Sequence, residues 1–163
     1  MTTQLMPVPL PEPGTVLLNR YRVERQLGRG GMGVVLAVRH IDLDKLFALK
    51  LLLPNALTFP DARERFLREA RAAARLTSEH ATRVVDVGTL KKTGLPYMVM
   101  EYLEGCDLRS VLDERECLSC TEAALYVYQA CQAVAEAHTQ NIVHRDLKPA
   151  NLFVTHRADS TLC

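Results

Sequence analysis

The sequence of 163 residues predicts an α+β fold in which a small antiparallel sheet with one helix precedes a helical segment. Two observations support this order. Between residues 21 and 103, short apolar stretches rich in β-branched and aromatic residues alternate with turn residues, which is typical of strands. Between residues 107 and 138, apolar residues recur at the three- and four-residue spacing of amphipathic helices. A further helix-like stretch, residues 61–76, interrupts the strands.

Length and composition are typical of a globular chain with one core, since 48% of the residues are hydrophobic and 24% are charged. A formal net charge of +1 and scattered Lys and Arg residues give no reason to expect a nucleic acid partner. No apolar run is long enough to span a membrane, and we expect no signal peptide. The five Cys residues, an odd number without a disulfide spacing, predict a cytoplasmic location. Composition says nothing about the oligomeric state.

Cys117 and Cys120 form a lone C-x-x-C motif. A zinc site would need a second such pair, and a redox site would need a thioredoxin-like context. Neither is present in the sequence, so we expect ordinary thiols.

Residues 1–19 are expected to form a Pro-rich flexible leader. Its four alternating prolines cannot donate to a helix or a sheet ladder: Pro7, Pro9, Pro11 and Pro13. Such a segment can also bind an aromatic groove of a partner, but a plain tail is the simpler interpretation.

Five short strands are predicted before residue 104: residues 21–25, 33–38, 46–53, 83–88 and 96–103. Between the third and fourth strands, residues 61–76 read as a helix with a single apolar stripe: Ala62, Phe66, Ala70, Ala73 and Leu76. The i,i+4 pairs Asp61–Arg65 and Glu64–Arg68 support this helix.

Two helices are predicted after residue 104. The first spans residues 107–114, and the second runs to about His138 from a capping box formed by Ser119 and Glu122. The second helix has an apolar stripe that needs a partner element: Ala124, Val127, Tyr128, Cys131, Val134, Ala135 and His138. Within this stripe, we expect His138 to be a packed core residue and not a ligand.

The glycines Gly28, Gly30 and Gly33 match G-x-G-x-x-G, which alone is a weak signal. A dinucleotide-binding fold would need a helix directly after them and an acid about 20 residues further on. Here a β-branched run follows, and Lys50 lies near the position of the acid. The glycines are therefore predicted to form a strand–turn–strand hairpin whose N–H groups can approach phosphate oxygens.

Lys50 lies inside an apolar run, where a lysine is costly unless it is paired. It could also extend from an edge strand to solvent. Glu69 lies within the apolar stripe of the 61–76 helix, three residues after Phe66, and needs a cation. We therefore predict an ion pair between Lys50 and Glu69.

Residues 142–153 read Ile-Val-His-Arg-Asp-Leu-Lys-Pro-Ala-Asn-Leu-Phe. Asp146, Lys148 and Asn151 form a tight group of an acid, a base and an amide. Apolar pairs flank the group, and we expect both to be buried anchors of a polar loop. The alternative is an ordinary polar turn that ends at a proline.

Within this loop, residues 144–151 resemble the catalytic loop of eukaryotic-type (Hanks-type) serine/threonine protein kinases, of the bacterial kind. The resemblance implies a five-stranded antiparallel N-lobe sheet with one helix (αC in that family) over residues 20–103. It also implies the first helices of an incomplete helical C-lobe over residues 104–163. By the same resemblance, Asp146 accepts the proton of a Ser/Thr hydroxyl on a protein substrate, Lys148 neutralises the transferred phosphoryl group, and Asn151 binds Mg²⁺.

The resemblance also implies an ATP site. Its Gly-rich loop would cover the phosphates, with Val35 over the adenine: Leu27, Gly28, Arg29, Gly30, Gly31, Met32, Gly33, Val34 and Val35. Lys50, oriented by Glu69, would bind the α- and β-phosphates. The residues implied around the adenine are Ala48, the gatekeeper Met100, and the hinge 101–103 with Glu101 and Leu103.

The resemblance covers about residues 21–154, roughly the first half of a kinase domain. Asp-Phe-Gly and Ala-Pro-Glu do not occur in the sequence, so the second magnesium ligand is missing. We therefore expect a kinase by family whose chain is inactive or weakly active, from an incomplete reading frame or a natural truncation. The alternatives are a non-catalytic fragment that binds nucleotide or docks on a kinase, and a fragment that does not fold alone.

Overall fold

The computed structural model describes residues 10–155, which form two compact units. Unit 1 comprises the chain up to Arg75 together with Arg83–Tyr102. Unit 2 comprises Leu76–Thr82 and the chain from Leu103 onward. Among residues 10–155, no helix is both long enough and apolar enough to cross a membrane.

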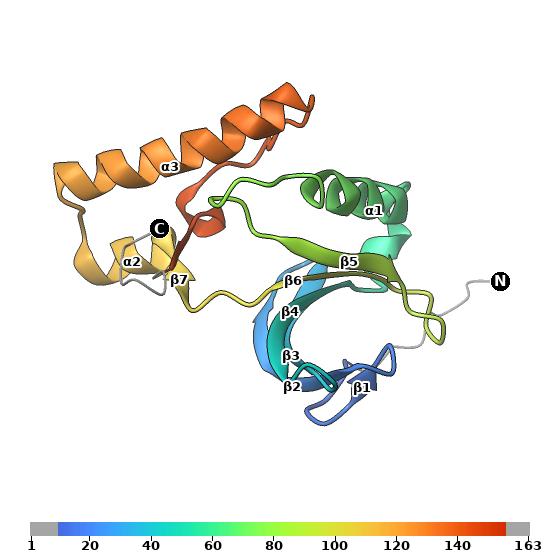
Figure 1. The fold of residues 1–163 in the computed structure, drawn as a ribbon. Helices are drawn as coiled ribbons and strands as arrows, with labels where there is room; N and C mark the ends of the chain where they lie inside the picture. Colours follow the sequence, from blue (N-terminus) through green and yellow to red (C-terminus); the bar gives the residue numbers. More distant parts are fainter. Residues whose placement is uncertain (1–9, 156–163) are drawn as a thin grey trace. The chain divides into compact units, whose positions relative to one another are not determined.

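Unit 1 is built on a curled antiparallel sheet of six strands in the order β1-β2-β3-β4-β6-β5 (Figure 1). The strands are β1 (Val16–Leu17), β2 (Tyr21–Arg29), β3 (Gly33–His40), β4 (Lys45–Leu52), β5 (Val84–Thr89) and β6 (Pro96–Glu101). All five predicted strands are present. The prediction of five strands missed β1, whose two residues pair with the start of β2.

The two faces of this sheet have different roles because successive side chains on a strand point to opposite sides. One face of β3, β4 and β6 forms the core with these buried residues: Val34, Leu36, Val38, Phe47, Leu49, Leu51, Tyr97 and Val99. Burying each large aliphatic side chain there contributes about 1.5–3 kcal/mol. The opposite face holds two cross-strand rows: Val35, Lys50 and Met98, then Ala37, Ala48 and Met100.

Residues 10–19 correct the prediction of a flexible leader that reaches residue 19. Leu10 and Leu17 are partly buried and pack against the core cluster. The Gly14 N–H donates to the Val23 carbonyl at 2.8 Å, and the Val23 N–H donates to the Thr15 carbonyl at 2.9 Å. Only Pro11 and Pro13 lie in this stretch, so its other residues keep the N–H groups that a sheet edge needs. Residues 1–9 of the predicted leader lie outside the described residues.

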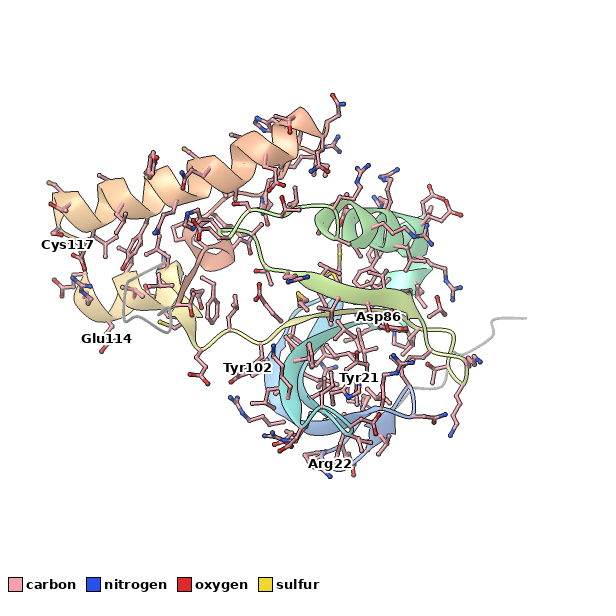
Figure 2. All side chains as sticks on the ribbon, viewed as in Figure 1. Tyr21, Arg22, Asp86, Tyr102, Glu114 and Cys117 are labelled. Carbon is pink, nitrogen blue, oxygen red and sulfur yellow. The ribbon has the colours of Figure 1, made fainter. Side chains whose placement is uncertain are left out.

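Tyr21 lies inside the curl of the sheet (Figure 2) and makes aromatic contacts with two other core-side rings. Its ring meets those of His40 and Phe47 edge-on, with centroid distances of 5.1 and 6.0 Å. The Tyr97 hydroxyl donates to Asp86 Oδ2 at 3.2 Å. Burial, and then the charge of Asp86, raise the pKa of both tyrosines.

The helix of unit 1, α1 (Ala62–Ala73), follows the short 3₁₀ helix η1 (Ala56–Thr58) and lies beside β5 and β6 (Figure 1). Phe66 is buried and packs in a cluster with Leu52 and Ala56. The helix is shorter at both ends than the predicted residues 61–76. It begins after residue 61, the N-cap, whose backbone angles are left-handed, and it ends at Ala73. Neither predicted i,i+4 ion pair forms in the described part of the chain.

Unit 2 contains α2 (Leu108–Arg115), α3 (Cys120–Thr139), the 3₁₀ helix η2 (Pro149–Asn151) and a two-stranded sheet, β7 (Gly105–Asp107) with β8 (Phe153–Thr155). The predicted capping box of α3 is confirmed. The Glu122 N–H donates to Ser119 Oγ at 3.2 Å, and the Ser119 N–H donates to Glu122 Oε2 at 3.1 Å.

β7 begins at a glycine that pairs with β8. Gly105 has φ of 144° and pairs with Thr155 of β8. A Cβ at this position would collide with the Val154 carbonyl oxygen. Gly105 is therefore required by close strand pairing as well as by backbone conformation.

The predicted apolar stripe of α3 is largely exposed. Val127 and Tyr128 have relative exposures of 61% and 62%, whereas Tyr126 and Ala137 are the residues of α3 that are buried. The prediction that His138 is packed in a core is wrong, because its side chain is exposed. The described cysteines are free exposed thiols, including Cys117 in the turn after α2 (Figure 2).

Polar contacts attach α3 to the segment that follows α1. Both carboxylate oxygens of Glu136 accept hydrogen bonds, from the Thr77 hydroxyl at 2.7 Å, the Thr77 N–H at 2.8 Å and the Ser78 N–H at 2.7 Å. The Thr77 hydroxyl is the main cause that lowers the pKa of Glu136. The segment 76–82 is thereby held to α3 by one carboxylate.

We expect the carboxyl of Glu122 to titrate far below an ordinary glutamate. Arg115 donates to both of its oxygens, at 2.8 and 3.0 Å, and this pairing, followed by Ser119, lowers the pKa of Glu122 to about 2. A lowered folded-state pKa means that the stabilisation is complete above pH 4.5 and is lost as the pH falls toward about 2.

An NMR titration of the side-chain carboxyl carbons measures this pKa directly. Arg115→Ala should raise the pKa of Glu122 toward its ordinary value, whereas Arg109→Ala, which removes a partner of Asp113, should leave it unchanged. A wild-type value near 4.5 would contradict the observed pairing.

Candidate functional site

The polar loop predicted over residues 142–153 joins α3 to β8 in unit 2. The Ile142 N–H donates to the Ala137 carbonyl at 2.9 Å, and the Leu152 carbonyl accepts from the Leu108 N–H at 2.7 Å. Both loop ends are thus fixed by backbone bonds. The prediction of two buried apolar pairs is wrong, since Val143 and Phe153 are 60% and 41% exposed and Ile142 and Leu152 are only partly buried.

The structure brings together the three residues singled out in this loop. Lys148 Nζ lies 2.9 Å from Asp146 Oδ2. Asn151 Nδ2 donates to the backbone oxygen of Asp146 at 2.8 Å and to its Oδ2 at 2.9 Å. Hydrogen bonding to Lys148, and then to Asn151, lowers the pKa of the Asp146 carboxyl. Asp146 is therefore an exposed, ionised carboxylate whose orientation is held by two neighbours, and it can accept a proton from a hydroxyl group.

Arg145 has a conformation that no sequence pattern revealed. Its φ is +63°, in the left-handed region that a side chain makes costly by about 1–2 kcal/mol. The residue precedes Asp146, and the Asp146 N–H donates to His144 Nδ1 at 3.4 Å. The strained residue thus lies where the chain turns to present the carboxylate, a position where such strain is common in functional loops.

Asn151 is suited to be one ligand of Mg²⁺. Within residues 10–155, the hydrogen bonds of its side chain use Nδ2, so the amide oxygen Oδ1 stays available as an acceptor. Magnesium prefers oxygen ligands and is bound through few protein groups together with substrate phosphates. Within residues 10–155, no cluster of three His, Cys, Asp or Glu side chains could hold a metal. The Asn151 amide oxygen fits as one ligand of a magnesium ion whose other ligands are phosphate oxygens and water.

The predicted glycine hairpin is the β2–β3 turn of unit 1. Its strands pair through Gly28↔Val35 and Arg29↔Val34, and the Gly30 N–H donates to the Gly33 carbonyl at 2.9 Å. A helix does not follow the glycines, because β3 begins at Gly33. The strand–turn–strand geometry predicted from the sequence is thus observed.

The glycines of this hairpin have two different reasons to lack a side chain. A Cβ at Gly33 would lie 2.7 Å from the Leu51 carbonyl oxygen, so the fold itself excludes one. A Cβ at Gly28, Gly30 or Gly31 would meet nothing within 4 Å, and none of the three has positive φ. The chain's own packing does not require glycine there. Open space beside backbone N–H groups is what a phosphate group needs to approach closely.

The two cross-strand rows lie on the outer face of the sheet, which is the face opposite the core, and the first row begins at Val35 in this hairpin. Val35 is the β3 partner of Lys50, and Ala48 is the β4 partner of Met100. The second of these rows contains two small side chains, Ala37 and Ala48, beside Met100. Of the predicted hinge residues, Glu101 ends β6 and its Oε1 accepts from the Arg83 N–H at 2.6 Å.

The predicted ion pair between Lys50 and Glu69 is absent from the ion pairs of residues 10–155, and both side chains are exposed. The prediction assumed that both charges were buried in apolar surroundings. Because neither is desolvated, neither requires a partner. Lys50 lies on β4 and Glu69 on α1, both in unit 1, and the two side chains form no ion pair among the described residues.

A cavity of about 370 Å³ lies on the core side of the sheet and not on the face of Lys50. Its lining is mostly aliphatic and includes Leu10, Leu17, Leu51, Leu90 and Leu95. Among the lining residues that the structure describes, Glu12 is the charged one. This mostly aliphatic lining contains no residue of the glycine hairpin or of the 142–153 loop.

Comparison with known proteins identifies similar chains. Residues 21–163 match the family described as protein kinase domain. A probable serine/threonine-protein kinase PknB of Corynebacterium glutamicum is 36% identical over 143 residues, which make up 86% of this chain and 22% of that protein. The kinase pkn3 of Myxococcus xanthus is 38% identical over 144 residues, 88% of this chain and 26% of that protein.

Among solved structures, the Mycobacterium tuberculosis PknI kinase domain aligns with a TM-score of 0.79 at 32% identity. The alignment covers 93% of this chain and 60% of the PknI chain. The present chain therefore spans about a quarter or less of these curated relatives and about three fifths of the PknI kinase domain.

The two kinds of glycine predict opposite effects of adding a methyl group. Gly33→Ala should lower the free energy of unfolding by about 1–3 kcal/mol, because the new Cβ meets the backbone of β4. Gly31→Ala, the matched control, should leave stability unchanged or slightly higher without a ligand. Urea denaturation of both variants measures the difference, and equal losses would show that the fold requires both glycines.

Proposed function

The chain belongs to the protein kinase family, and we propose that it carries the ATP-binding and catalytic-loop parts of a serine/threonine protein kinase. The observation that carries this proposal is the bonded group of Asp146, Lys148 and Asn151 in unit 2. The glycine hairpin and Lys50 of unit 1 support it independently.

In the proposed reaction, Asp146 orients the Ser or Thr hydroxyl of a protein substrate and accepts its proton. The hydroxyl oxygen forms a bond to the γ-phosphorus of ATP, the bond to the β–γ bridging oxygen breaks, and ADP leaves. Lys148, held at 2.9 Å from Asp146, offsets negative charge that develops on the transferred group. Magnesium, when bound, supplies further charge neutralisation at the phosphates.

On the nucleotide side, the N–H groups of Gly31 and Met32 donate no hydrogen bond within residues 10–155, and a Cβ at Gly31 would meet open space. Lys50 is the charged side chain of the adjoining row and is proposed to bind the α- and β-phosphates. The residues proposed to contact the adenine are Leu27, Val35, Ala48, Met100, Glu101 and Leu103. Glu69 is proposed to orient Lys50 once nucleotide is bound.

A second candidate function is nucleotide binding without phosphoryl transfer. It is favoured by the lack of an ion pair between Lys50 and Glu69 within residues 10–155. The two candidates share the nucleotide site and differ in whether Asp146 takes part in chemistry.

A radiolabelled phosphate-transfer assay with a generic protein substrate separates the candidates. If the chain transfers phosphate, Asp146→Asn should lower the rate by about 10²–10⁴-fold, because the amide cannot accept the proton. Asp113→Asn, on the exposed surface of α2, should not change the rate. Nucleotide binding without transfer supports the second candidate, and transfer that survives Asp146→Asn contradicts the first.

Thermal unfolding with added ATP and Mg²⁺ tests the site that both candidates share. At a free ATP concentration about 100-fold above Kd, binding should stabilise the chain by about 2.7 kcal/mol and raise Tm. Lys50→Met should reduce this shift strongly, whereas Lys45→Met at the start of β4 should not. A Tm that does not move at millimolar ATP would refute nucleotide binding by this chain.

A further inference from the structure

The tip of the glycine loop is attached to the segment that follows β4. Asn55 Nδ2 donates to the Gly31 carbonyl at 2.8 Å. The Leu53 N–H donates to the next carbonyl, that of Met32, at 2.9 Å. The two donors come from the same short stretch and hold two successive peptide groups of the loop.

These bonds determine which way the amide groups of the loop point. The carbonyl of one residue and the N–H of the next lie in one plane and point in opposite directions. When Asn55 draws the Gly31 carbonyl toward itself, the N–H of Met32 must point to the other side. Among the hydrogen bonds of residues 10–155, none uses that N–H. The loop therefore presents a free donor on the side away from Asn55.

Asn55 is itself firmly placed. Its carbonyl accepts the Thr58 hydroxyl at 2.7 Å in the turn that forms η1. The next residue, Ala56, is 1% exposed and packs with Phe66 of α1. The backbone that carries the Asn55 amide is thus held by the turn of η1 and by the packing of Ala56 on α1.

We propose that Asn55 is a positioning residue that fixes the Gly31–Met32 peptide with its N–H directed at the phosphates of the nucleotide. It touches neither nucleotide nor substrate. This inference rests on the proposed nucleotide site and adds a residue that the glycine motif does not contain. The sequence does not reveal this role, because Asn55 and Gly31 lie 24 residues apart.

Binding of two probes to the full chain tests the proposal. Asn55→Ala should weaken ATP·Mg²⁺ binding by about fivefold, the typical effect of one hydrogen bond, and leave adenosine binding unchanged, because adenosine has no phosphates. Asn55→Asp, the isosteric change that removes the donor, should weaken ATP binding at least as much. Gln132→Ala removes a side-chain amide donor on α3 and should change neither affinity.

Amide hydrogen exchange without nucleotide provides a second readout. In Asn55→Ala, the Leu53 N–H should exchange about fivefold faster, while Leu49 at the centre of β4 keeps its wild-type rate. Unchanged ATP affinity, or an equal loss for ATP and adenosine, would overturn the positioning role. If the wild-type chain binds no ATP, the proposed function fails, and the exchange of Leu53 still decides whether Asn55 holds the loop.

Discussion

Side chains on β3, β4 and β6 alternate between the two faces of one sheet, and unit 1 uses both faces. Leu36 and Leu49 on one face are almost fully buried and hold the strands together. The same strands place Val35 and Lys50 side by side on the other face. A slip of one residue in the pairing would send Lys50 into the core and Leu49 to the surface, so the core also fixes the register of the candidate site.

The polar loop of unit 2, residues 142–153, is held in a different way. Its residues are exposed, and short-range polar bonds among Asp146, Lys148 and Asn151 set its geometry. Backbone bonds at both ends of the loop, and the strained Arg145, fix the direction in which the carboxylate points. The bonds among Asp146, Lys148 and Asn151 are local in sequence, and the bond from Leu108 also lies within unit 2, so contacts of unit 2 alone arrange the loop. Mutations that remove one of the three polar partners should therefore act on chemistry more than on stability.

Features with a local physical cause could be predicted from the sequence. The capping box of α3 depends on residues three apart, and the glycine hairpin on the β-branched run that follows it. The group of Asp146, Lys148 and Asn151 was predicted because all three residues lie within six positions of each other.

Features that depend on distant contacts could not be predicted. Lys50 and Glu69 seemed to need each other only because both were assumed to be buried. His138 was assigned to a core from helical periodicity, which identifies a stripe but not what covers it. The roles of Gly105 and Asn55 depend on strand partners and carbonyls that are far apart along the chain.

Backbone and methyl chemical shifts of the full chain, recorded with and without ATP·Mg²⁺, most directly test whether the outer face of the sheet is a nucleotide site. We expect shifts at Gly30, Met32, Val35 and Ala48, which lie in the glycine loop or on the face of Lys50. The opposite face, with Val34, Leu36 and Leu49, should change little. Shifts confined to the core face or its cavity, or none at millimolar ATP, would contradict the proposed site.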